Sequence, residues 1–134
     1  MARVTREGGV VAACVWDFAG GGSPLSLFWR ASRELDPDVE DESRRAGTGR
    51  GDLSRLLHEA GLREVEERAV SVDVEHPSFE EWWEPYELGV GPAGAYVTRL
   101  DPRPREELRE RCREALPEAP FRIAAHAWTA VGVV

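Results

Sequence analysis

The residues best suited to bind a small molecule are aromatic, and they stand at two places in the chain. Trp16 and Asp17 end the first apolar run, and Trp82, Trp83 and Tyr86 crowd one short predicted helix. Open α/β sheets bind ligands beyond the carboxyl ends of their strands, where the first group falls. Adjacent residues of a helix point about 100° apart, so the two tryptophans are not expected to face one core together. Core packing of that helix is the favoured interpretation, and the alternative is that one of the two tryptophans lines a pocket or a partner surface.

The histidines and cysteines are weaker candidates for chemistry. His58, His76 and His126 are scattered along the chain and lack the spacing of metal ligands. His126 could act as a base in the last predicted strand, although a hydrogen-bonded structural histidine is the favoured interpretation. Cys14 and Cys112 both fall at predicted core positions, and two cysteines do not make a disulfide framework. The sequence therefore assigns no catalytic residue and no metal site.

Two glycine-rich segments and one acidic run lack the features of the sites that they resemble. The segment GVGPAG, residues 89–94, matches G-x-G-x-x-G, but a predicted helix precedes it and Pro92 removes an amide. The segment GTGRGD, residues 47–52, lacks the Lys-Ser/Thr pair of a phosphate-binding loop. The acidic run 36–42 lacks the glycine and the glutamate of a calcium loop. Surface turns and a solvated loop are expected at these places.

The composition is that of a soluble globular domain. The chain has 134 residues, of which 42% are hydrophobic and 31% charged, so it is long enough to bury a core. Its net charge of -8 argues against a nucleic-acid partner, because binding phosphates needs a basic surface. No run approaches the ~18 apolar residues of a membrane span. We expect a cytoplasmic protein without a membrane partner.

The spacing of apolar residues predicts that strands and helices alternate in an α/β fold. Val10–Trp16 has the pattern of a strand covered on both faces, as in the middle of a parallel sheet. In Val70–Glu75, valines alternate strictly with polar residues, which predicts a strand with one solvent-exposed face. A last strand is expected from Phe121. Helices are expected to begin near four residues: Ser23, Asp52, Ser78 and Pro104. Pro85 is expected to kink or stop the third of these.

The order of these elements resembles the C-terminal half of class I S-adenosylmethionine-dependent methyltransferases of the ubiquinone-biosynthesis-like, small-molecule type. The segment ARVTREGGVVAACVWDF is similar to the entry into the fifth strand of that family, with Glu7 where the family has proline. DLSRLLHEAGLREVEERAVSV resembles the following helix and the sixth strand. FRIAAHAWTAVGVV resembles the antiparallel seventh strand. Residues 76–104 resemble the insertion between strands six and seven, which implies a lid on the acceptor side.

The resemblance implies a Rossmann-like half-fold over residues 1–134, taken as one partial domain. Its sheet is expected to be mixed, in the order 5-7-6, with the last strand antiparallel and with flanking helices. The glycine-rich loop that binds S-adenosylmethionine lies in the other half of the family fold, so no residue here is assigned to that cofactor. The implied function is methyl transfer to a small molecule, with negligible activity from this chain alone. The residues expected to line the acceptor pocket are Trp16, Asp17, Phe28, Trp29, Trp82, Trp83 and Tyr86.

A non-catalytic docking module is the alternative function. In the family, the fifth strand pairs with strand four on one side and strand seven on the other, and this chain lacks the first of these neighbours. One edge of Val10–Trp16 is therefore expected to be bare, and a bare edge offers unpaired backbone groups to another strand. The partner would be a separately encoded N-terminal half or a second copy of the chain.

Overall fold

The computed structural model describes residues 2–134, and within them it has an α/β fold with three strands and five α-helices. These residues form two compact units. Residues 2–23, 42–72 and 124–134 make the sheet unit, and residues 24–41 and 73–123 make the helical unit. None of the helices in residues 2–134 is both long and apolar enough to cross a bilayer.

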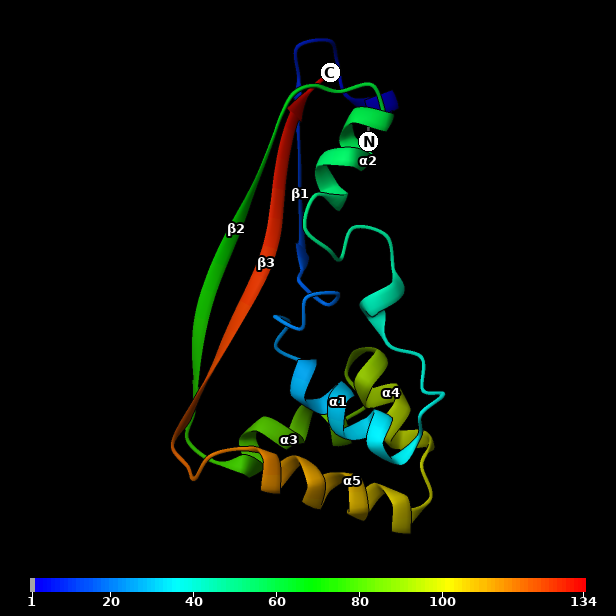
Figure 1. Cartoon of the computed structure of the whole chain (residues 1–134), viewed down its shortest axis with the longest axis vertical. Helices are drawn as coiled ribbons and strands as arrows, with labels where there is room; N and C mark the ends of the chain where they lie inside the picture. The colour runs from blue at the N-terminus through cyan, green and yellow to red at the C-terminus, as the bar shows by residue number, and fades with distance from the viewer. Residues whose placement is uncertain (1) are drawn as a thin grey trace. The chain divides into compact units, whose positions relative to one another are not determined.

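The sheet is antiparallel and places the last strand in the middle. Its strands are β1 (Val10–Trp16), β2 (Arg63–His76) and β3 (Phe121–Val133), in the order β1-β3-β2 (Figure 1). β1 pairs with β3 from Val10 opposite Val133 to Trp16 opposite Ala127. The predicted first strand is thus confirmed, with the same bounds. Within the described residues β1 pairs with β3 alone and forms an edge of the sheet, so the expected bare edge of Val10–Trp16 is present.

One face of the sheet unit is covered by a helix. Helix α2 (Asp52–Glu59) contributes Leu53 and Leu57 to a buried cluster with Val11, Leu62 and Ala130. The α2 N-terminus is held by a side chain from β2, since Glu67 accepts hydrogen bonds from the amides of two residues, Gly51 at 2.6 Å and Ser54 at 2.8 Å. Asp52 was expected to cap this helix, but it is the first helical residue and Gly51 occupies the N-cap position.

The opposite face of the same strands is apolar and exposed. In β1, Val10, Ala12, Cys14 and Trp16 point away from the cluster around α2, and Val10 is 66% exposed. Val131 shares their face because it is paired with Ala12. Ser71 bonds to His126, which lies on the α2 side with Trp128, so its neighbours Val70 and Val72 lie on the opposite side. We call these seven residues the open face: Val10, Ala12, Cys14, Trp16, Val70, Val72 and Val131.

The open face corrects three predictions. Val10–Trp16 was expected to be covered on both faces, and Cys14 was expected to lie in the core. The valines of β2 were expected to form the buried face of that strand. In the structure Cys14 is exposed and Val72 is 45% exposed. The reason is that α2 covers only the other side of the strands. The apolar pattern predicts that these residues favour burial, but it does not identify the element that packs against them.

The helical unit is built from four helices around one aromatic core. They are α1 (Ser26–Leu35), α3 (Phe79–Glu87), α4 (Gly91–Arg99) and α5 (Pro102–Ala115). α1 packs on α5, and α3 packs on α4 (Figure 1). Phe28, Trp83, Leu108 and Cys112 are fully buried where these helices meet. The prediction for Cys112 is confirmed.

Most of the helix boundaries lie close to the predicted ones. Ser78 caps α3 as expected, with its hydroxyl accepting from the Glu81 amide at 3.1 Å. α3 continues through Pro85 for two residues, so the proline does not stop it. α1 begins at Ser26 rather than near Ser23, which is buried. α5 begins at Pro102, two residues before the expected start.

The prediction of a surface turn at residues 89–94 is wrong, because this segment leads into helix α4 and forms its first turn. Gly94 explains why this sequence suits a helix at that place. A Cβ added to Gly94 would lie 2.4 Å from the carbonyl carbon of Gly89, so only glycine permits the close approach. Helix α3 precedes the glycines, so the strand that a dinucleotide loop requires is not there.

Candidate functional site

The structure brings five of the seven predicted site residues together in the core of the helical unit. Phe28 stacks on Tyr86 with ring centroids 4.5 Å apart and an interplanar angle of 11°. Phe28 also meets Trp29 edge to face at 5.0 Å. Trp82 and Trp83 are 5% and 1% exposed, so both are core residues. This burial accords with core packing, the favoured interpretation of the two tryptophans.

Both tryptophans are buried because α3 is packed on more than one side. Trp83 and Tyr86 contact Phe28 of α1, while α4 packs along α3. On a further side, the guanidinium of Arg113 from α5 lies 4.1 Å from the centre of the Phe79 ring. A helix enclosed by three others can bury residues that point 100° apart.

Two indole donors in this core have no acceptor. The Nε1 atoms of Trp29 and Trp83 are buried and have no hydrogen-bond partner among the residues that the structure describes. Buried indole N–H groups normally find an acceptor, because an unmade hydrogen bond costs free energy.

Burial also changes the acid–base behaviour of the core. It raises the pKa of the Cys112 thiol to about 12, with the negative charge of Glu34 adding to the effect. It raises the pKa of the Tyr86 hydroxyl well above its ordinary value in the same way. Both groups are therefore neutral near pH 7, and Cys112 does not have the thiolate character of a nucleophile.

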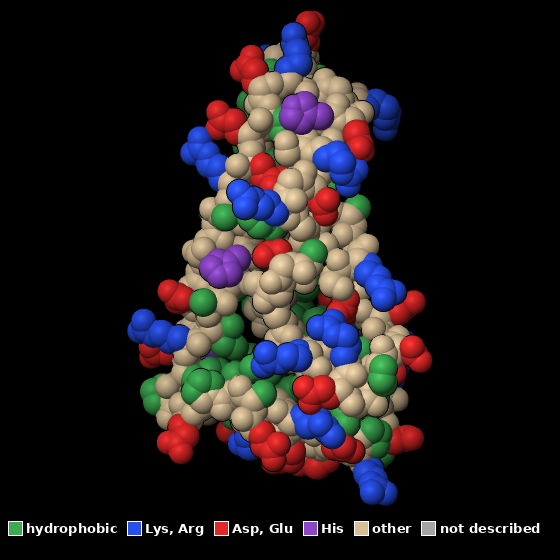
Figure 2. Space-filling view, viewed as in Figure 1, with side chains coloured by type: hydrophobic (Ala, Val, Ile, Leu, Met, Phe, Trp, Pro, Cys, Tyr) green, Lys and Arg blue, Asp and Glu red, His purple; other side chains and the backbone are tan. Residues whose placement is uncertain are grey.

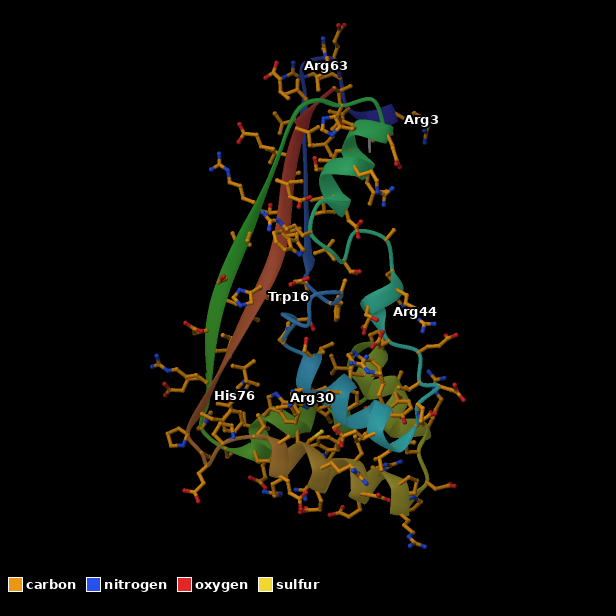
Figure 3. All side chains as sticks on the ribbon, viewed as in Figure 1. Arg3, Trp16, Arg30, Arg44, Arg63 and His76 are labelled. Carbon is orange, nitrogen blue, oxygen red and sulfur yellow. The ribbon has the colours of Figure 1, made fainter. Side chains whose placement is uncertain are left out.

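The other two predicted residues, Trp16 and Asp17, belong to the sheet unit. Trp16 ends β1 on the open face (Figure 3). Asp17 begins a loop, residues 17–22, that folds back on β3. The Asp17 amide donates to the His126 carbonyl at 2.9 Å, and the His126 amide donates to the Gly22 carbonyl at 2.7 Å. The loop thus forms hydrogen bonds with both the carbonyl and the amide of His126.

The side chains around His126 form a polar group that we call the Asp17–His126 site: Asp17, Ser71 and His126. The Ser71 hydroxyl lies 2.7 Å from His126 Nδ1. Asp17 Oδ2 and His126 Cδ2 lie within 3.1 Å of one point, which is where a Cβ on Gly22 would stand. Asp17 Oδ1 accepts from the Gly20 amide at 2.9 Å, which fixes the carboxylate. Ser71 and His126 are exposed, so the site is open to solutes.

The sequence signals only part of the Asp17–His126 site. Asp17 was predicted as a binding residue, and His126 was weighed as a base and as a structural histidine. Ser71 was missed, because it lies 55 residues from His126 and only the pairing of β2 with β3 joins them. The observed hydrogen bond accords with the structural interpretation of His126, and the nearby carboxylate keeps its interpretation as a base open.

Other charged groups do not add a second centre. Acidic and arginine side chains are interspersed over the visible face (Figure 2), and pairs such as Glu80 and Arg113 are joined at 2.9 Å. Within residues 2–134, no group of three or more His, Cys, Asp or Glu side chains is placed to hold a metal ion. The Asp17–His126 site therefore remains the candidate for chemistry in the sheet unit.

Comparison with known proteins assigns no family to the chain. No protein-family model matches it, and no curated protein matches it either.

Proposed function

We propose that this chain is the acceptor-side half of a small-molecule methyltransferase of the class I, S-adenosylmethionine-dependent type. The observation that carries the proposal is the sheet order β1-β3-β2 together with the bare edge of β1 and the open face beside it. If the three strands correspond to the family's fifth, seventh and sixth, the last strand lies antiparallel between the other two. The order and directions of the strands agree with that correspondence.

The edge of β1 supports the presence of a further strand in the complete assembly. Edge strands are normally protected by charges, proline or bulges. The sequence VVAACVW of β1 contains none of the charged residues or prolines. An apolar edge strand without protection is typical of a strand that another strand covers.

The open face supports the presence of a further layer on the same side. Seven apolar residues on three strands are exposed on this face, and α/β sheets bury such faces under helices. The edge and the face meet in β1. One partner made of strands and helices would cover both, and such a unit is what the N-terminal half of the family fold contains.

The residues present do not fit the methyl donor. A binding loop for its charged and polar groups needs free backbone amides. In the loop 17–22, the amides of residues 19–22 are engaged by oxygens of Thr48, Asp17 and Phe18. We therefore assign this chain only to the methyl acceptor, with Trp16 and Asp17, at the carboxyl end of β1, as the residues proposed to contact it.

Isothermal titration with S-adenosylmethionine tests the assignment. The chain alone is expected to give no heat of binding, and co-expression with a polypeptide that carries a GxGxG strand–loop unit is expected to create binding. Micromolar affinity of the chain alone would contradict the half-site proposal. The DNA upstream is a second test, because an in-frame strand followed by GxGxG is expected there.

Non-catalytic docking is the second candidate, and the same bare edge favours it. Under the docking hypothesis, the edge of β1 pairs with a strand of a partner protein, and the resulting assembly performs no methyl transfer. Light scattering after size-exclusion chromatography separates the possibilities. A well-folded monomer across micromolar concentrations would count against a homodimer and leave a heterologous partner to be found.

A further inference from the structure

We draw no further inference here: the strongest candidate, the open face of the sheet unit together with the unpaired edge of β1, already belongs to the proposed function, and nothing in the structure shows what covers it.

Discussion

The helical unit and the sheet unit bury their apolar residues to different extents. In the helical unit, the rings of Phe28 and Trp83 and the side chain of Leu108 are fully enclosed by α1, α3, α4 and α5. In the sheet unit, α2 covers one face while Val10 and Val72 remain 66% and 45% exposed on the other. Helices can close a core among themselves, whereas a sheet has two faces and needs a layer on each.

The difference indicates which of the two units has all the packing partners of its core within the described residues. The aromatic core has its packing partners within residues 24–41 and 73–123, so its stability should depend on its own residues. The open face has no such cover within the described sheet unit. Substitutions there should matter for association more than for folding. Four measurements test this contrast between the units.

Phe28→Ala should have the largest effect. Phe28 contacts Trp29, Trp83, Tyr86 and Tyr96, and truncating a buried phenyl ring costs about 3–5 kcal/mol through lost burial and the cavity left behind. Urea unfolding followed by tryptophan fluorescence measures the change. Val72→Ala on the open face is the control, with an expected change within ~0.5 kcal/mol. Equal losses in the two variants would contradict the contrast between the units.

Alkaline pH should destabilise the helical unit. Folding raises the pKa of Cys112 from its ordinary 9.0 to about 12 through burial. Its contribution to stability is therefore complete below pH 9 and is lost as pH rises toward 12, because the unfolded thiol ionises first. Tyr86, whose pKa burial also raises, acts in the same direction. Urea midpoints between pH 8 and 11 should fall, and fall less in Cys112→Ala. A flat pH profile would mean that these groups reach water.

Glu67→Gln should have a moderate effect, confined to the sheet unit. The carboxylate accepts from the amides of Gly51 and Ser54 at the start of α2, and replacing a charged cap costs about 1 kcal/mol. Loss of amide protection in α2, measured by hydrogen exchange, is the readout. Glu66→Gln is the matched control, since Glu66 is exposed and pairs with the exposed side chain of Arg68. Equal effects in both variants would argue against the cap.

Ala12→Lys should have the smallest effect on the isolated chain. Ala12 is exposed in the middle of the open face, so a lysine there should change the free energy of unfolding by less than ~0.5 kcal/mol. The same change should prevent association with a partner that covers the face, because it would bury a charge. Thermal melts measure the first effect, and a pull-down with a co-expressed polypeptide that carries a GxGxG strand–loop unit measures the second. A large destabilisation of the isolated chain would show that this face is already covered.

Local patterns in the sequence predict local structure well. The bounds of Val10–Trp16 and the cap at Ser78 follow from neighbouring residues, because an apolar run and a serine before a helix act over a few positions. The burial of both Trp82 and Trp83 could not be predicted in this way. It depends on α1, α4 and α5, which are separate in sequence and enclose α3 on several sides.

The helices and strands, their α/β order and the residues that need burial follow from the amino-acid sequence, because strand and helix periodicity are short-range properties. How those residues become buried depends on the tertiary structure. It placed β3 between β1 and β2, enclosed the tryptophans, left the open face bare and joined Ser71 to His126 across 55 positions. These outcomes depend on which distant segments become neighbours, and that choice is made by packing the whole chain rather than by any stretch of it.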